Sequence, residues 1–379
     1  MKKNYYRCLS RKYRPKLFKN IKGQKHIIKN IQYSIKNSSI HHAYIITGIR
    51  GIGKTTLARI FAKSLNCKQI NINNNIEPCL KCNSCISVEQ NIQEDVIEID
   101  AASNTGIMDI KQIIESCKYK PISHKYKIFI IDEIHMISNS AFNALLKILE
   151  EPPHFCKFIM ITTEIDKIPL TIISRCQKFS LFRLNHQSIL QCILEILKNE
   201  DIKIQKEAIL MLANISEGSV RDMLSILDQI ITINISQSIT IENIMNVLGI
   251  VNPYITYDLL KYLIYNNIKD ALFLIKKLYN FGFSMHSIIS ELSVLIYNVI
   301  TYKIENTKVK SIYNFCKEDY YTIVKKSSII TLIRLWQICN EKLYYTNSLY
   351  DKMHHIEMFI IKVVYTNFFI HPGDMLEIR

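Results

Sequence analysis

The chain has 379 residues, 48 of them Lys or Arg and 33 Asp or Glu, for a formal net charge of +15. Hydrophobic residues make up 48% and charged residues 21%, which excludes a disordered chain, and the length is sufficient for two or three domains. The positive surplus favours a polyanionic partner, most simply nucleic acid, although a composition biased toward Ile, Asn and Lys contributes to it.

The ends of the chain and its apolar runs carry no targeting or membrane signal. Residues 1–16 are basic, but no apolar run follows them, so they do not read as a signal peptide. The stretches 287–301 and 355–370 are interrupted by charged residues, and neither offers the roughly 20 clean apolar residues of a membrane span. We therefore expect a cytoplasmic protein without a membrane partner, in which the eleven cysteines do not form disulfides.

Up to about residue 180, short apolar runs alternate with helical patterns, which is typical of an α/β fold with a parallel sheet and crossover helices. Strands are predicted at 42–47, 96–100, 127–132 and 158–163, and helices at 54–65 and 141–150. The second helix follows the capping candidates Ser138 and Asn139 and stops before two prolines.

After about residue 180 the strand signals fade and helical patterns continue to about residue 370. Residues 186–232 predict three amphipathic helices with breaks near Asp201 and Gly218. The chain is therefore divided into an α/β nucleotide domain at 1–182, a small helical domain at 183–245, an all-α C-terminal domain at 246–370, and a tail at 371–379.

Residues 48–55, GIRGIGKT, match the phosphate-binding pattern G-x-x-x-x-G-K-[ST] between a predicted strand and a predicted helix. Glycines let backbone N–H groups surround phosphates without a Cβ in the way, and the helix N-terminus favours anions. Lys54 is expected to reach the β- and γ-phosphates of ATP, and Thr55 to bind Mg²⁺. The predicted nucleotide-binding set is Gly48, Ile49, Arg50, Gly51, Ile52, Gly53, Lys54, Thr55 and Thr56.

Asp132 and Glu133 end the apolar strand at 127–132. Acidic residues at strand ends are common as solvated caps, but after a phosphate loop Asp132 is expected at the Mg²⁺ and Glu133 beside an attacking water. A neighbouring Glu favours hydrolysis over a kinase reaction, because water needs a base.

Two arginines could complete such a site. Arg175 lies in SRC, after a helical pattern, and Arg221 lies in GSVRDML, at the first turn of a predicted helix. An arginine can spread positive charge over a γ-phosphate and raise the rate about 10³-fold. On spacing alone, a surface ion pair is the commoner use of an arginine.

Four cysteines, Cys67, Cys79, Cys82 and Cys85, follow the pattern C-x11-C-x2-C-x2-C. A closed set of four thiolates predicts a structural Zn²⁺ ion, with an iron–sulfur cluster or free thiols as alternatives. No other feature suggests electron transfer. A metal clip can order the polar, Asn-rich loop at 69–77, which would not fold by burial. The other seven cysteines are scattered singly and are expected to act as small buried apolar residues.

These motifs together resemble the gamma/tau subunits of the bacterial DNA polymerase III clamp loader, which are AAA+ ATPases. The resemblance covers roughly residues 5–232, and the helical remainder is similar to the family's oligomerising domain more loosely. Besides the cysteines, the matching segments are RKYRP (11–15), KGQ (22–24), HHAYIITGIRGIGKTT (41–56), DAASNTGI (100–107), IIDEIHMIS (130–138), FNALLKILEEPP (142–153), ITTEIDKIP (161–169), ISRCQKF (173–179) and GSVRDMLSILDQ (218–229).

The resemblance implies roles for particular residues. Arg175 is the expected arginine finger toward the ATP of a neighbouring subunit, and Arg221 the sensor of the γ-phosphate within its own subunit. Thr163 is the expected second sensor, and Arg14 and Pro15, with residues 21–24, line the adenine side. In the family's terms the domains are an AAA+ domain with a zinc module at 67–85, a lid domain and a collar domain.

The resemblance also implies partners: other clamp-loader subunits in a hetero-pentamer, the sliding clamp, primer–template DNA and the polymerase holoenzyme. No polymerase active site is visible, and nothing after residue 370 resembles the extra domains of the longer tau form, so a short gamma-like form is expected. Two alternatives stay open. One is another AAA+ nucleic-acid motor, such as a branch-migration helicase, and the other is an ATP-binding clamp-loader scaffold that does not hydrolyse ATP.

Overall fold

The computed structural model describes residues 8–70, 76–90, 95–103, 106–233, 238–305, 323–324, 326–345 and 353–366. The predicted tail at 371–379 lies outside them. The chain divides into two compact units, Met1–Ile202 with Leu212–Thr232, and Lys203–Met211 with Ile233–Arg379.

The elements follow the expected change from strands and helices to helices alone. In chain order they are α1 (Leu9–Lys12), η1 (Phe18–Asn20), α2 (Lys25–Lys36), β1 (Ala43–Thr47), α3 (Lys54–Asn66), α4 (Asn83–Gln90), β2 (Val96–Asp100), α5 (Ile107–Ser116), β3 (Lys127–Asp132), η3 (Ile134–Met136), α6 (Asn139–Glu150), β4 (Cys156–Thr162), η4 (Ile165–Lys167), α7 (Leu170–Ile173), β5 (Gln177–Ser180), α8 (His186–Glu200), α9 (Lys206–Ile215), α10 (Val220–Ile233), α11 (Ile241–Leu248), α12 (Pro253–Ile264), α13 (Ile268–Asn280), α14 (Met285–Glu305), α16 (Ile329–Tyr345) and α17 (Met353–Thr366).

The first unit contains a five-stranded sheet of order β2-β3-β4-β1-β5, in which neighbouring strands are parallel. The four predicted strands form to within two residues of their predicted ends. The sequence analysis missed β5, because this edge strand has only four residues and begins with the exposed Gln177 and Lys178. So short and polar a run has no apolar pattern to reveal it.

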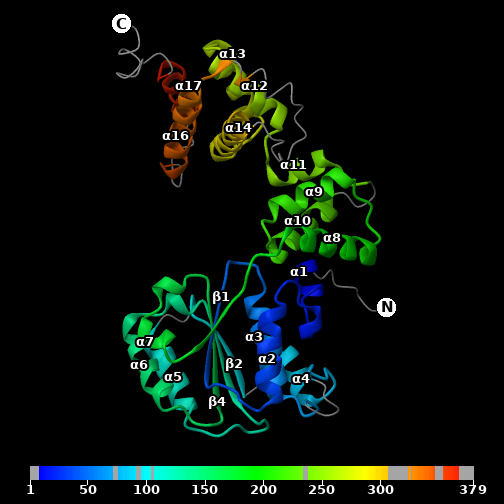
Figure 1. Cartoon of the computed structure of the whole chain (residues 1–379), viewed down its shortest axis with the longest axis vertical. Helices are drawn as coiled ribbons and strands as arrows, with labels where there is room; N and C mark the ends of the chain where they lie inside the picture. The colour runs from blue at the N-terminus through cyan, green and yellow to red at the C-terminus, as the bar shows by residue number, and fades with distance from the viewer. Residues whose placement is uncertain are drawn as a thin grey trace. The chain divides into compact units, whose positions relative to one another are not determined.

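The three central strands are buried on both faces, and alternate side chains belong to opposite cores. In β1, Tyr44 and Ile46 pack with α2 and α3, whereas Ala43 and Ile45 pack with α5, α6 and α7. Figure 1 shows these two groups of helices on the two faces of the sheet. Packing on both faces fixes the positions of the strand ends relative to one another, and with them the positions of the residues that follow each strand.

The carboxyl ends of β1, β3 and β4 meet at one edge of the sheet. Thr47, the last residue of β1, pairs with Thr162, the last residue of β4, and β4 lies between β1 and β3. The segments that follow these strands are therefore neighbours, although they are far apart in the sequence. In open parallel sheets this edge is where ligands bind.

Local signals set the helix boundaries as predicted. Ser138 caps α6 by accepting a hydrogen bond from the N–H of Ala141 at 3.3 Å. The predicted breaks near Asp201 and Gly218 are left-handed residues, with φ of +53° and +83°, between α8, α9 and α10. The prediction of three helices in 186–232 is confirmed.

The second unit is helical in the residues that the structure describes. Its core is built by α12, α13, α14, α16 and α17. The α12 helix begins at Pro253 after the capping residue Asn252, whose Oδ1 accepts from the N–H of Tyr254 at 3.0 Å.

One helix among the described residues, α14, is long and apolar enough to cross a membrane by length and composition alone. The stretch 287–301, in which charged residues were expected to interrupt any membrane span, lies within this helix. Ile289, Leu292 and Ile296 of α14 are buried in the helical core, and core helices of globular proteins pass the same test.

The scattered cysteines only partly follow the prediction. Cys117, Cys156, Cys192 and Cys339 are buried, but Cys8 and Cys176 are only half-buried. Two of the buried ones are neighbours, since the Cys156 thiol lies 3.5 Å from the carbonyl oxygen of Cys117. The seventh, Cys316, lies outside the described residues.

Candidate functional site: a phosphate loop, an acidic pair and a cysteine cluster

The phosphate loop runs from the buried end of β1 to the first residue of α3. Gly48, Gly51 and Gly53 have φ of +151°, +77° and +100°, a region that disfavours side chains. A Cβ at Gly51 would lie 2.1 Å from the Ser219 hydroxyl oxygen, so this glycine is required by close packing as well as by conformation. At Gly53 a Cβ would meet nothing within 4 Å.

Lys54 is buried, and its ammonium donates hydrogen bonds to the carbonyl oxygens of Gly48 and Ile49, both at 2.9 Å. Burial lowers the pKa of Lys54, although the carboxylates of Glu133 and Asp132 oppose this. The lysine is thus held inside the loop, close to the acidic pair. Of the other loop residues, Ile52 is buried in the core, Arg50 is exposed, and Thr56 is half-buried in the first turn of α3.

Thr55 and Asp132 form the part of the site suited to a metal ion. The Thr55 hydroxyl donates to Asp132 Oδ2 at 2.7 Å, across 77 positions of sequence. Mg–O bonds of about 2.1 Å place adjacent ligands of an octahedron about 3 Å apart. The two oxygens therefore fit one Mg²⁺ coordination sphere.

Glu133 follows Asp132 in a left-handed conformation, with φ of +48°, and its N–H donates to Asp132 Oδ1 at 3.0 Å. Such a conformation costs about 1–2 kcal/mol for a residue with a Cβ. It turns the side chain toward Thr163, whose hydroxyl donates to Glu133 Oε2 at 3.2 Å. Thr163 lies one residue beyond β4.

Arg221 lies at the phosphate loop, and its N–H donates to the carbonyl oxygen of Gly51 at 3.2 Å. Ser219 and Arg221 come from the start of α10, more than 160 positions after the loop. The structure thus brings this predicted residue to the nucleotide side of the sheet. The Arg221 side chain itself is exposed.

Arg175 makes its contacts away from this cluster. Its guanidinium donates to the carbonyl oxygen of Thr171 at 2.7 Å and to the Glu150 carboxylate at 2.6 Å. Both partners are exposed, at the ends of α7 and α6. The described contacts of Arg175 do not join it to the Lys54 cluster.

The N-terminal segment leads past the phosphate loop. Partial burial and the nearby charges of Arg59 and Arg221 lower the pKa of Arg14, and Pro15 is half-buried. Gln24, at the end of the KGQ segment, is buried and donates to the carbonyl oxygen of Phe182 at 2.6 Å. This contact places the predicted adenine-side segment at 22–24 beside Phe182, just after β5.

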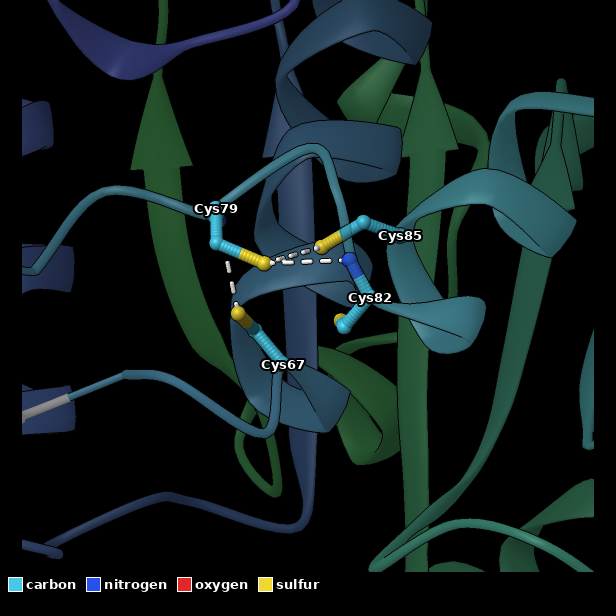
Figure 2. A group of neighbouring side chains, drawn as sticks. All are labelled: Cys67, Cys79, Cys82 and Cys85. Atoms are coloured by element: carbon cyan, nitrogen blue, oxygen red, sulfur yellow. Dashed lines mark hydrogen bonds between the residues drawn. The ribbon is translucent and has the colours of Figure 1, made fainter.

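The four clustered cysteines converge on one point, as Figure 2 shows, and their sulfur atoms all lie within 4.8 Å of one another. A zinc ion with Zn–S bonds of about 2.3 Å places its sulfurs about 3.8 Å apart, and Cys79 Sγ lies 4.0 Å from Cys85 Sγ. Cys67 ends α3, Cys79 and Cys82 come from the following turn, and Cys85 lies in α4. The donor set fits a tetrahedral thiolate-bound metal.

Backbone N–H groups point at the sulfur atoms. Those of Cys79 and Cys82 donate to Cys67 Sγ at 3.4 Å and to Cys79 Sγ at 3.3 Å. Burial opposes the charged form of Cys79, but the N–H groups of Lys81 and Cys82 outweigh it and lower the pKa of Cys79 to about 7. Burial raises the pKa of Cys85, which a bound cation would reverse.

The structure adds several residues to the site that were not predicted. These are Thr162, His135, Glu164 and Ser219. His135 was a residue of a quoted motif, but nothing in its spacing indicated contact with Glu133. The pairing of β3 with β4 brings Thr162 and Glu164 to His135.

A parallel sheet with a phosphate loop after β1 and an Asp–Glu pair at the end of β3 defines a P-loop ATPase. Comparison with known families narrows this class. Three family models match consecutive parts of the chain. The model described as DNA polymerase III, delta subunit, matches residues 23–185, and the model described as DNA polymerase III clamp loader subunit, ATPase lid domain, matches residues 188–234. The model described as DNA polymerase III subunits gamma and tau domain III matches residues 239–377.

Several curated proteins are similar over most of the chain. DNA polymerase III subunit gamma of Buchnera aphidicola subsp. Acyrthosiphon pisum is 38% identical over 298 residues, covering 78% of this chain and 81% of that protein. Subunit tau/gamma of Haemophilus influenzae is 42% identical over 255 residues, covering 67% of this chain but only 36% of that protein. The chain therefore belongs to the DNA polymerase III gamma/tau family, and it is an ATPase subunit of the clamp loader.

Solved structures are more distant. The RuvB Holliday junction branch migration motor of Thermotoga maritima is 18% identical with a TM-score of 0.46, over 66% of this chain and 79% of that one. The clamp loader delta protein of Bacillus subtilis is 12% identical with a TM-score of 0.37, over 89% and 99%. Neither likeness supports a functional argument, and the family assignment favours a clamp loader over a branch-migration helicase.

Proposed function

We propose that this chain uses ATP binding and hydrolysis to open a sliding clamp and place it on primer–template DNA. The observation that carries the proposal is the complete set of Lys54, Thr55, Asp132 and Glu133 at one edge of the sheet, joined by the 2.7 Å bond between Thr55 and Asp132. The same set argues against a scaffold that binds ATP without hydrolysing it.

Each residue has a separate part in the proposed reaction. Loop N–H groups and Lys54 bind the phosphates, while Thr55 and Asp132 hold Mg²⁺, which supplies charge neutralisation at the phosphate oxygens. Glu133 accepts a proton from the attacking water, and Thr163 holds one of its carboxylate oxygens. Arg221, next to Gly51, contacts the γ-phosphate of the nucleotide that is bound in the same subunit. Arg14 and Pro15 line the adenine side.

Arg175 is proposed to act on the nucleotide of a neighbouring subunit. Its guanidinium is bound at the exposed ends of α6 and α7 and not within its own phosphate site. An arginine in this place can contact the nucleotide of a neighbouring subunit only when the subunits assemble, so hydrolysis can depend on the partners. The proposed assembly is a hetero-pentamer of clamp-loader subunits that binds the clamp and the polymerase holoenzyme in the cytoplasm.

The domain division is also proposed in the family's terms. An AAA+ domain at 1–182 carries the zinc module at 67–85, a lid domain spans 183–245, and a collar domain at 246–370 holds the subunits together. The family matches change between 185 and 188, close to the first boundary, and between 234 and 239, before the second.

The cysteine cluster is proposed to hold one structural Zn²⁺. Four sulfur atoms within 4.8 Å and N–H groups directed at two of them support this. Four protein ligands leave no open coordination position, so the ion supplies cross-linking and takes no part in ATP chemistry.

Lys54→Ala tests the proposed function. In the assembled loader, ATP-dependent placement of a labelled clamp on primed DNA is expected to fall at least ~10²-fold, because the phosphates lose their buried cation. Lys68→Ala is the matched control, since Lys68 is an exposed lysine just beyond α3, and it should load normally. Normal loading by Lys54→Ala would refute the proposal.

A further inference from the structure

The region beside Glu133 contains a buried histidine that the proposed mechanism does not use. His135 lies in η3, the short turn after β3, and its side chain is only 6% exposed. Its Nδ1 atom is 3.1 Å from the Thr162 hydroxyl oxygen and 3.5 Å from Glu133 Oε2. Its Nε2 atom is 3.4 Å from Glu164 Oε1. The imidazole therefore lies between the carboxylates that follow β3 and β4.

The hydrogen bonds of Thr162 fix which ring nitrogen carries a proton. The Thr162 hydroxyl donates to the carbonyl oxygen of Glu164 at 3.1 Å and accepts from the N–H of Glu164 at 3.0 Å. A hydroxyl has one proton, so when that proton is directed at the Glu164 carbonyl oxygen, Nδ1–H of His135 is the donor to Thr162. That N–H also faces Glu133.

One oxygen of the Glu133 carboxylate thus has neighbours on two sides. Oε2 accepts from the Thr163 hydroxyl at 3.2 Å and faces His135 Nδ1–H at 3.5 Å. Within the part of the chain that the structure describes, we find no protein donor on Oε1. This leaves Oε1 as the oxygen available to a water molecule.

The far side of the ring is anchored in turn. Glu164 forms an ion pair with Lys167 at 2.9 Å, and this lysine lowers the pKa of Glu164. Because Glu164 lies in the segment after β4, the anchor fixes the ring relative to a second strand. Nδ1 thus lies at Thr162 and Nε2 lies near Glu164, so the ring sits between Glu133 and the segment that follows β4.

We propose that His135 is a positioning residue for Glu133: it orients the carboxylate so that Oε1 faces the attacking water. The inference rests on the proposed role of Glu133 as the base. It deepens that role by naming the residue, outside the phosphate loop, on which the geometry of the base depends. A misplacement of about 1 Å at a reacting group can cost about 10²-fold in rate.

Two near-isosteric variants separate the two nitrogens. In His135→Asn the side-chain amide can replace Nδ1–H toward Glu133 and Thr162, whereas in His135→Gln it can replace only Nε2. In single-turnover hydrolysis by the assembled loader with clamp and primed DNA, His135→Gln is expected to lose about 10- to 100-fold, with ATP affinity changed less than about threefold. His135→Asn should recover most of that rate.

A double variant distinguishes the failure of this inference from the failure of the proposed function. In a Glu133→Gln background, His135→Gln should lower the rate no further, because both changes act on the same group. A full rate in Glu133→Gln alone would refute Glu133 as the base. If Glu133→Gln is slow and adding His135→Gln lowers the rate by the same factor as it does alone, only the positioning role is refuted. Equal losses of ATP affinity in His135→Gln and His135→Asn would also refute only the positioning role.

Discussion

At the scale of single residues, the site depends on side chains whose conformations are costly in isolation. Glu133 is left-handed without being glycine, and Lys54 is buried. Each is compensated locally, Glu133 by Asp132 and Thr163, and Lys54 by the carbonyl oxygens of its own loop. Such strained and buried groups are typical of functional sites.

Arg175→Ala is predicted to separate nucleotide binding from turnover. Removing the guanidinium should leave ATP affinity of the isolated subunit within about twofold, because Arg175 bonds with Thr171 and Glu150 in its own chain. Turnover of the assembled loader should fall about 10³-fold, as for other arginine fingers. Equilibrium nucleotide binding and steady-state hydrolysis measure the two quantities.

Glu150→Gln is the matched control for this variant. It removes the charge of the exposed Glu150 but keeps the Arg175 guanidinium, and an exposed ion pair contributes at most about 1 kcal/mol. Turnover should therefore stay near that of the unaltered loader. A large loss of ATP affinity in isolated Arg175→Ala would argue against a role in a neighbouring subunit.

At the scale of elements, the cysteine cluster is tied to the segment that precedes the nucleotide site. Glu77, two residues before Cys79, accepts from the N–H groups of Phe18 and Lys19 at 2.8 and 3.0 Å. Phe18 is fully buried in the core that contains α2 and α3. The segment that carries the cysteine cluster thus also contacts the core on which the ATPase sheet packs.

Glu77→Ala is predicted to destabilise the protein without releasing metal. Two N–H groups, of Phe18 in a partly buried bond and of Lys19 in an exposed one, lose a charged acceptor, so the free energy of unfolding should fall by about 1–3 kcal/mol. Metal analysis should still give one zinc per chain, since the four sulfur ligands are unchanged. Denaturant unfolding and metal content are measured on the same samples.

Glu89→Ala serves as the control in the same module. Glu89 pairs with Lys16 and Lys63 through a partly exposed carboxylate, so the loss should stay below about 1 kcal/mol. Equal destabilisation by both variants would contradict the special role of Glu77. Zinc loss in Glu77→Ala would show that the carboxylate maintains the metal site itself.

At the scale of the whole molecule, the formal charge of +15 suits contact with a phosphate backbone. If the assembled loader neutralises about five phosphates, raising salt from about 50 to 200 mM should weaken binding of primed DNA by about 10²- to 10³-fold. The ratio should be the same for unrelated sequences, because phosphate contacts carry no base information. Fluorescence anisotropy at graded salt measures it, and a flat salt dependence would contradict backbone-directed binding.

Much of the fold was predictable because its signals are local. The buried runs of β1 and β3, the cap at Ser138 and the breaks at Asp201 and Gly218 all depend on residues within a few positions of one another. The edge strand β5 and helix α4 were not predicted, since a short polar strand and a helix inside a cysteine loop lack apolar periodicity.

The sequence by itself determined which chemical groups the site contains. The phosphate loop, the acidic pair and the four thiols each consist of contiguous or closely spaced residues. Tertiary structure alone decided which distant residues join them. Thr163 meets Glu133 because β3 and β4 are paired in parallel, and Ser219 meets Gly51 because the start of α10 packs on the loop. Spacing along a chain carries no information on such contacts, because the register of a sheet and the packing of a helix are set by the whole core.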